Sequence, residues 1–170
     1  TLIARAEADQ EPRNWPARPG GLLPLVALAT VWTWAQAVLG GLVSSSHAGC
    51  ACPDWPTCNG RWFPPMQGPV GLQMMHRLGG YGLLAVMGLA AFAARRAPDP
   101  RVALGATLAL GLTVIQIVLG VCNVLLRTPV WLSAAHLGTA AAILALMVVT
   151  LFRTARLPAA SLRLAAWESP

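Results

Sequence analysis

The chain has 170 residues, of which 56% are apolar and 11% charged, and its mean hydropathy is +0.59. A soluble domain carries about a quarter charged residues, so this composition excludes a disordered chain and an ordinary cytosolic enzyme. The net charge of +6 comes from Arg alone, without Lys, set against six acidic residues. A pI near 10.5 would suggest a nucleic-acid partner unless the placement of the arginines has another cause.

Four apolar stretches without Asp, Glu or Lys predict four membrane-spanning helices. They cover residues 24–43, 70–94, 102–126 and 130–152. Each is long enough to cross a hydrocarbon core of about 30 Å as a helix, which satisfies its own backbone polar groups in lipid. The predicted fold class is all-α: a polytopic membrane protein built as a four-transmembrane-helix bundle. A buried soluble bundle is the less favoured alternative, because these stretches have almost no polar face.

The arginines sort by side if the chain crosses the membrane four times. One side holds Arg5, Arg13, Arg18, Arg95, Arg96, Arg101, Arg153, Arg156 and Arg163. The other side has Arg61 in a loop, with Arg77 and Arg127 at or near span ends. The positive-inside rule then predicts a protein of the bacterial inner membrane with both termini on the cytoplasmic side. The basic charge therefore indicates topology, and no nucleic-acid partner is expected.

Three regions follow from this topology. Residues 1–23 are expected to form a flexible cytoplasmic lead-in, residues 24–152 a membrane domain and residues 153–170 a cytoplasmic tail. The first apolar run is too long for a signal peptide and lacks its small-residue cleavage site. The chain starts at Thr1, which leaves its natural start open.

The connection 44–71 is the only long one between spans, and it holds three of the four cysteines. It is expected on the periplasmic or outer side, where disulfides persist. A Cys52–Cys58 disulfide is the first choice and Cys50–Cys58 the second, because spacing does not fix connectivity. A zinc site that uses His47 and these thiols matches no usual spacing. A redox-active thiol pair is the remaining alternative.

Two histidines are predicted at matched depth inside the membrane. His76 and His136 each lie about six residues into an inward-running span, roughly 9 Å below its outer edge. Ionisable groups in membranes are costly and usually functional. Two imidazoles at one depth suit axial ligation of one haem iron, with Arg77 and Arg127 near the position of the haem propionates. The alternative is that each histidine forms a hydrogen bond to a neighbouring helix.

A short internal repeat pairs the two halves of the chain. Gln36-Ala-Val-Leu-Gly40 in the first span matches Gln116-Ile-Val-Leu-Gly120 in the third, and each precedes a span with a histidine. The repeat predicts two helical hairpins related by a pseudo-twofold axis, each giving one ligand. Gln36 and Gln116 either line the haem pocket or form interhelical hydrogen bonds.

These residues resemble the haem A synthase family of cytochrome oxidase assembly. The resemblance covers about residues 30–150 and rests on Gln36-x-x-Leu-Gly-Gly-x-Val, Cys52-Pro-Asp-Trp-Pro-Thr-Cys58-Asn-Gly and His76-Arg77. It implies oxidation of the C8 methyl of haem O to the formyl of haem A. It also implies a haem held by His76 and His136, and a Cys52/Cys58 pair that takes part in electron transfer. The haem would be haem B, or haem O and haem A as substrate and product.

Two departures from the family pattern bear on function. Many members have two four-helix halves, and one half here implies a homodimer or a second half as partner, besides membrane lipid. Haem O synthase or a respiratory complex are further expected partners. The family's glutamate three residues before its first histidine is Gln73 here, and glutamine cannot ionise. The residues thus favour a haem A synthase-type enzyme but leave open a non-catalytic membrane cytochrome b, or a structural subunit without haem.

Overall fold

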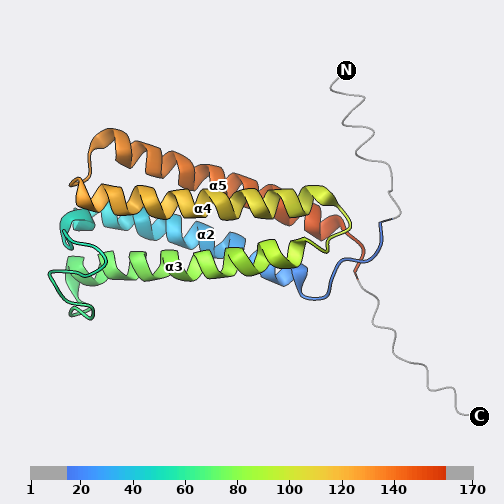
Figure 1. Ribbon diagram of the computed structural model, residues 1–170, viewed down its shortest axis with the longest axis horizontal. Helices are drawn as coiled ribbons and strands as arrows, with labels where there is room; N and C mark the ends of the chain where they lie inside the picture. The colour runs from blue at the N-terminus through green and yellow to red at the C-terminus, as the bar shows by residue number, and fades with distance from the viewer. Residues whose placement is uncertain (1–14, 160–170) are drawn as a thin grey trace, which may run out of the picture.

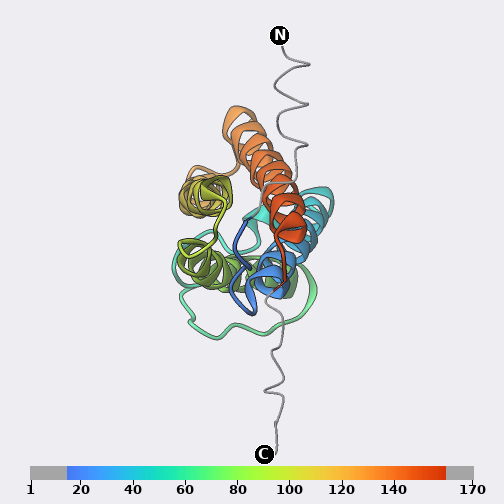
Figure 2. The same cartoon turned by 90° about the vertical axis from the view of Figure 1, so that its right-hand side faces the viewer.

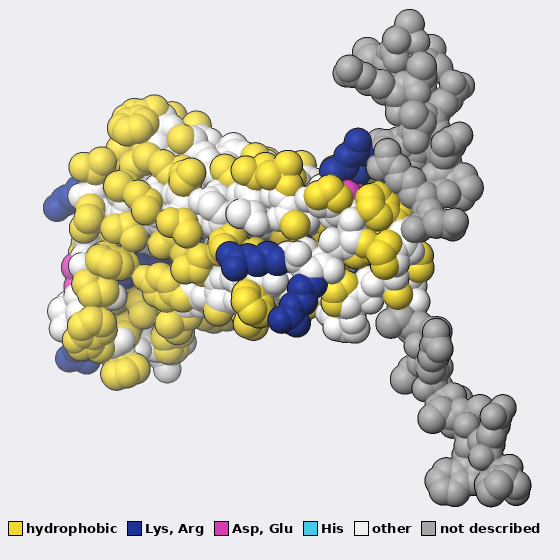
Figure 3. Space-filling view, turned by 45° about the vertical axis from the view of Figure 1, so that its right-hand side comes forward, with side chains coloured by type: hydrophobic (Ala, Val, Ile, Leu, Met, Phe, Trp, Pro, Cys, Tyr) yellow, Lys and Arg dark blue, Asp and Glu magenta, His cyan; other side chains and the backbone are white. Residues whose placement is uncertain are grey.

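The computed structural model describes residues 15–159. Its long helices are α2 (Leu22–Ser45), α3 (Gly68–Ala94), α4 (Pro100–Leu125) and α5 (Val130–Arg156), and the 3-10 helix η1 (Ala48–Cys50) follows α2. Residues 15–159 contain no β-strand. All four long helices are apolar enough to span a membrane, and the face seen in Figure 3 is mostly hydrophobic. The predicted all-α, four-span fold is confirmed.

The four helices run up and down around a square. Both α2 and α4 pack against α3 and against α5, so α3 and α5 lie on one diagonal. One end of the bundle carries the long loop 46–67 and the α4–α5 turn (Figures 1 and 2). The other end carries the α3–α4 link and both ends of the described chain. We call these the loop end and the terminal end.

The helices match the predicted spans to within two residues, except at the end of α5. This helix continues to Arg156, four residues beyond the predicted limit at 152. Arg153 and Arg156 occupy its last turn, where cations interact favourably with the free carbonyl groups of a helix. The guanidinium of Arg156 also lies 4.1 Å from the ring centroid of Phe152. The helix therefore continues beyond the apolar stretch from which its end was predicted.

The segment before α2 is held against the segment after α5. The backbone N–H of Arg18 donates to the carbonyl of Pro158 at 2.8 Å, and its Nη1 donates to the carbonyl of Leu157 at 2.6 Å. The end of the predicted lead-in, around Arg18, thus contacts the segment that follows α5, and the flexibility of the lead-in stays a prediction. Residues 1–14 and 160–170, with Arg5, Arg13 and Arg163, lie outside the described residues.

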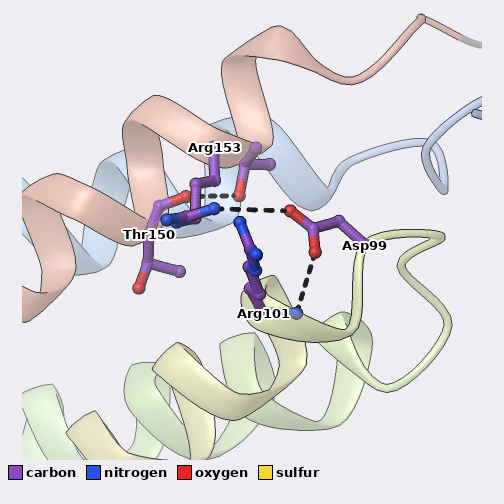
Figure 4. A network of polar contacts seen from close by, with 5 residues as sticks. Asp99, Arg101, Thr150 and Arg153 are labelled. Atoms are coloured by element: carbon purple, nitrogen blue, oxygen red, sulfur yellow. Dashed lines mark hydrogen bonds and ion pairs between the residues drawn. The ribbon is translucent and has the colours of Figure 1, made fainter. Parts of the chain in front are cut away.

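The link between α3 and α4 is braced by Asp99 (Figure 4). Its Oδ1 accepts a hydrogen bond from the backbone N–H of Arg101 at 2.9 Å, which caps α4, and Pro100 occupies the first turn. Its Oδ2 lies 4.0 Å from Nη1 of Arg153 on α5. One carboxylate thus joins the start of α4 to the end of α5.

The apolar core fills the part of the bundle nearer the terminal end. Its largest fully buried side chains include Leu22, Met87, Ile143 and Met147. Buried threonines lie among them, and their hydroxyls donate to carbonyls four residues earlier, as Thr113 does to Ala109 at 2.8 Å. These polar groups are satisfied within their own helices. The titratable side chains inside the bundle lie nearer the loop end.

Candidate functional site

His76 on α3 and His136 on α5 face each other across the diagonal of the bundle. Their ring centroids are 6.4 Å apart, and the ring planes are inclined by 75°. Both helices begin at the loop end, at Gly68 and Val130, so each histidine lies within the first three turns. The structure therefore brings together the two histidines that were predicted to lie at one depth in the membrane.

Each imidazole packs against a glycine of the neighbouring helix. A β-carbon on Gly40 of α2 would lie 3.0 Å from Cε1 of His76, and one on Gly120 of α4 would lie 3.2 Å from Cε1 of His136. Contacts this close favour residues without a side chain. The two glycines end the two copies of the repeat, so the α2–α3 and α4–α5 hairpins make the same contact. The glycine that ends each copy of the repeat is the sequence signal for this close contact, and it was not among the predicted site residues.

The two repeat glutamines lie beside the histidines but differ in hydrogen bonding. Nε2 of Gln36 is 3.0 Å from Nδ1 of His76, and it donates to the backbone carbonyl of His76 at 2.6 Å. In the other hairpin, Oε1 of Gln116 and Nδ1 of His136 are both buried, and neither has a hydrogen-bond partner within residues 15–159. Buried polar atoms are normally paired. The second hairpin therefore retains hydrogen-bonding capacity inside the bundle.

Gln73 lies one turn before His76 and is 4% exposed. Its Oε1 is a further buried acceptor with no partner in the described part of the chain. Three residues before His136, the corresponding side chain is Ser133, whose hydroxyl donates to Oδ1 of Asn123 at 3.0 Å. The two hairpins thus carry uncharged polar side chains on the loop-end side of the histidines.

Arg77 reaches from α3 to the cysteine loop. Its Nη1 donates to the carbonyl of Thr57 at 2.9 Å and its Nη2 to the carbonyl of Cys52 at 2.7 Å. One turn later, the hydroxyl of Tyr81 accepts a hydrogen bond from Nε1 of Trp55 at 2.8 Å. These contacts clamp the loop onto the helix that carries the first histidine. The predicted contact of Arg77 with haem propionates stays a prediction for its remaining N–H groups.

Arg127 is exposed in the turn between α4 and α5. It and Thr128 both have left-handed backbone conformations, with φ of 58° and 56°. The hydroxyl of Thr128 lies 3.8 Å from Sγ of Cys50, so this turn contacts the long loop. Arg127 lies at the loop end, as expected for a partner of haem propionates, and that role stays a prediction.

Cys52 and Cys58 form a disulfide, which was the first choice from the sequence. Inside the loop that it closes, the Asp54 carboxylate accepts hydrogen bonds from the Thr57 hydroxyl and from the backbone N–H groups of Gly60 at 2.9 Å and Asn59 at 2.6 Å. These bonds, that of Thr57 above all, lower the pKa of Asp54 to about 2. The loop is thus braced from within by one carboxylate.

The other thiols stay unpaired. Cys50 is free and exposed, and Cys122 is free and partly buried. Within residues 15–159, no three side chains of His, Cys, Asp or Glu gather as a metal site. The disulfide also occupies two of the loop sulfurs that a zinc site would need. The zinc alternative with His47 therefore has no support in the structure.

Comparisons with known proteins match most of the chain. Residues 1–148 match the family described as cytochrome oxidase assembly protein. A Heme A synthase of Methylobacterium sp. (strain 4-46) is 36% identical over 78% of this chain and 41% of its own length. A Heme A synthase of Paracoccus denitrificans (strain Pd 1222) is 36% identical over 68% of this chain and 33% of its own.

A Protoheme IX farnesyltransferase of Halobacterium salinarum (strain ATCC 29341 / DSM 671 / R1) is 32% identical over 85% of this chain and 32% of its own length. The chain thus spans less than half the length of these curated relatives. No solved structure matches it. By its family match and its relatives, the chain belongs to the haem A synthase family of cytochrome oxidase assembly proteins.

Proposed function

We propose that the chain binds one haem between His76 and His136 and acts in the haem A synthase reaction. In that reaction the C8 methyl group of haem O is oxidised to the formyl group of haem A. The single observation that carries haem binding is the 6.4 Å separation of the two imidazole centroids across the bundle. The facing imidazoles of His76 and His136 would supply two nitrogen ligands to the iron of a haem bound between them. The donor set therefore fits a haem iron.

The neighbouring side chains prepare the imidazoles for this role. A ring that binds iron through Nε2 must carry its hydrogen on Nδ1, and that hydrogen needs an acceptor. Rotation of the Gln36 amide would offer its oxygen to an N–H at Nδ1 of His76, in exchange for the bond that Nε2 donates to the His76 carbonyl. In the second hairpin, Oε1 of Gln116 and Nδ1 of His136 are both buried and unpaired, and we propose that they pair when the haem is bound. The bound haem, as haem B or as haem O and haem A, supplies the redox chemistry.

The cysteine loop is proposed as the route by which electrons reach or leave the haem. A disulfide takes up two electrons and two protons to become two thiols. The contacts of Arg77 with the carbonyls of Cys52 and Thr57 hold this pair against the helix of His76. The residue that holds the disulfide loop, Arg77, is thus the direct sequence neighbour of His76.

We also propose that the loop end faces the periplasm and the terminal end faces the cytoplasm of a bacterial inner membrane. Near the terminal end the described residues include Arg18, Arg95, Arg96, Arg101, Arg153 and Arg156. The loop end has Arg61, Arg77 and Arg127. This asymmetry supports the orientation through the positive-inside rule. A second copy or a second four-helix unit, haem O synthase and a respiratory complex remain proposed partners.

Purified protein from a host that makes haem O tests the proposal by optical spectroscopy and pigment extraction. We expect a six-coordinate low-spin haem in the wild type and haem A among the extracted pigments. His76→Ala and His136→Ala should each lose most of the haem. His47→Ala is the matched control and should keep it, because His47 is exposed in the loop. Unchanged haem content in the first two variants would rule out the bis-histidine site.

A second function, a non-catalytic cytochrome b, is favoured by one observation. Gln73 is buried where the family resemblance expects a glutamate, and an amide can neither take a proton nor carry charge. Folded, haem-loaded wild type that yields no haem A would support this function. Gln73→Glu separates the two functions, because it should raise the yield of haem A only if the site is otherwise competent.

A further inference from the structure

A tight hairpin carries two aromatic side chains away from the disulfide. Cys58 and Arg61 exchange backbone hydrogen bonds of 2.9 and 3.1 Å. Between them Asn59 and Gly60 both have left-handed conformations, with φ of 51° and 74°. This is the geometry of a two-residue Asn-Gly turn. The chain therefore reverses directly after Cys58, and Trp62 and Phe63 follow the residue that pairs with Cys58.

These residues are apolar and open to their surroundings. Trp62 is 66% exposed, Phe63 95% and Met66 50%. Pro64 and Pro65 stiffen the segment between them, and Pro64 is buried. We call residues 61–66 the aromatic tip. A soluble loop would not be expected to present its bulkiest apolar side chains in this way.

The aromatic tip lies directly before α3, a helix apolar enough to span a membrane. It stops two residues before α3 begins at Gly68. Figures 1 and 2 show the loop before α3 lying beside the helix ends and projecting sideways from the bundle. The other helices carry exposed apolar side chains to the same end, including Leu126 at 57%, Val130 at 86% and Trp131 at 68%. The apolar outer surface of the bundle therefore continues to the loop end.

The chemistry of the tip matches the boundary between lipid headgroups and acyl chains. Tryptophan and other aromatic rings gather at this boundary, and arginine pairs with lipid phosphate. The Arg61 side chain is exposed and makes no hydrogen bond or ion pair within residues 15–159. A hollow of about 390 Å³ beside it is lined by polar Asn59 and Gln67 and by apolar Val70. This mixed lining suits a phospholipid headgroup and the start of its chains.

We propose that the aromatic tip is a membrane anchor. Trp62 and Phe63 insert into the interfacial region of the leaflet at the loop end, and Arg61 contacts lipid phosphate. The anchor follows the Asn-Gly turn directly, so it holds Cys58 and its disulfide at the bilayer surface. Arg77 and Tyr81 hold the same loop from the side of the bundle. The disulfide loop is thus fixed between lipid and α3, independently of which side of the membrane it faces.

Site-directed nitroxide labelling tests the anchor in vesicles of phosphatidylcholine and phosphatidylglycerol. The background carries Cys50→Ser and Cys122→Ser, which removes the free thiols and keeps the disulfide. Labels are placed through Phe63→Cys, through Val118→Cys as a lipid-facing reference, and through Ser46→Cys as a loop reference. Mass spectrometry of peptides verifies that the label is on the new cysteine. Relaxation by oxygen, which prefers lipid, is compared with relaxation by a nickel chelate, which stays in water.

We expect an oxygen-to-nickel accessibility ratio at residue 63 that is severalfold above the Ser46 reference. A ratio equal to that reference would overturn the anchor, since the tip would then be in water. Low accessibility to both reagents would also overturn it, because a protein surface such as a second copy would then cover the tip. Arg61→Gln should lower the ratio at residue 63, because the side chain that contacts lipid phosphate is then uncharged. A ratio unchanged by Arg61→Gln would exclude the phosphate contact.

A second measurement needs no new cysteine. Brominated lipids quench tryptophan that lies in the membrane, and Trp62→Phe removes one tryptophan from the protein. The difference between wild type and Trp62→Phe reports on Trp62 alone. We expect that this difference signal is quenched by lipids brominated near the headgroup. A signal that brominated lipids do not quench would contradict the anchor even if the Phe63→Cys protein failed to fold.

Discussion

Gly40 of α2 and His76 of α3 approach so closely that a β-carbon on the glycine would lie 3.0 Å from Cε1 of the ring. Gly120 and His136 repeat this relationship at 3.2 Å in the second hairpin. Each imidazole ring thus packs against the backbone of the preceding long helix. The orientation of each ring depends on the absence of a methyl group.

Gly40→Ala is therefore expected to displace the His76 ring and weaken haem binding. Overpacking of this kind costs about 1–3 kcal/mol, and each 1.4 kcal/mol is a factor of about ten in affinity. Haem titration of the purified protein, followed by the low-spin absorption spectrum, measures the change. Gly120→Ala should act in the same direction through His136.

Gly41→Ala is the matched control for this experiment. A β-carbon at Gly41 meets nothing within 4 Å, so the ring is not disturbed. Helix propensity alone would make this variant slightly more stable, by up to about 1 kcal/mol. Equal haem affinities for Gly40→Ala and Gly41→Ala would show that the close contact does not set the ring.

The pairing of the histidines could be predicted from the sequence because it depends on length and position. In lipid an apolar stretch must close its own hydrogen bonds, which makes it a helix of known rise. Counting residues from the span ends then places His76 and His136 at one depth, and the structure brings them together. The helix end at Arg156 was missed because the last turn depends on arginines and not on apolarity.

The partners of Arg77 could not be predicted in this way. They are carbonyls of Cys52 and Thr57, and their positions depend on the path of a loop without periodicity. That path is set by the hydrogen bonds of Asp54 and by the disulfide. Likewise, the repeat predicts equal positions for Gln36 and Gln116, but their hydrogen bonds differ.

Arg77→Lys is expected to loosen the disulfide loop. A single ammonium group does not reproduce the fork that reaches two carbonyls. The loss of one hydrogen bond of about 1 kcal/mol corresponds to a roughly fivefold larger open population. The rate at which an external thiol reduces Cys52–Cys58, followed by alkylation and mass spectrometry, should rise by this factor. Arg96→Lys, at the terminal end, should leave the rate at the wild-type value, and a similar increase in both variants would contradict the clamp.

The internal brace of the loop predicts a specific pH dependence. The pKa of Asp54 is lowered from 3.8 to about 2, first by the Thr57 hydroxyl and then by the N–H groups of Gly60 and Asn59. A carboxylate with a lowered pKa stabilises the fold fully above its unfolded pKa, and the contribution is lost as pH falls through the folded pKa. The brace should therefore hold from neutral pH to about pH 4 and fail towards pH 2.

Asp54→Asn lacks the charge at every pH and serves as the reference. We expect a phosphine, which reduces disulfides in acid, to open Cys52–Cys58 faster in Asp54→Asn than in wild type above about pH 4. The ratio of the two rates should approach one as the pH nears 2. The ratio cancels the effect of pH on the phosphine itself. A ratio that has already reached one at pH 5 would mean that the lowered pKa does not brace the loop.

Asp99 has two roles at the terminal end that substitution can separate (Figure 4). Its Oδ1 caps α4 through the N–H of Arg101, and its Oδ2 lies 4.0 Å from Nη1 of Arg153. Asp99→Ala removes both contacts, whereas Asp99→Ser removes the charge and keeps a capping oxygen. A lost cap costs about 1 kcal/mol, and a partly exposed ion pair at 4.0 Å contributes about 0–1 kcal/mol. Thermal unfolding in detergent should therefore show a clear loss for Ala and a smaller one for Ser.

The ion pair is isolated by adding Arg153→Gln to each background. In the wild type this change should lower the unfolding midpoint slightly, and in Asp99→Ser it should have no effect, because the charged partner is already absent. If Asp99→Ser were as damaging as Asp99→Ala, the carboxylate would act through its charge and not through the cap. That outcome would shift the role of Asp99 from starting α4 to tying α4 to α5 across the terminal end of the bundle.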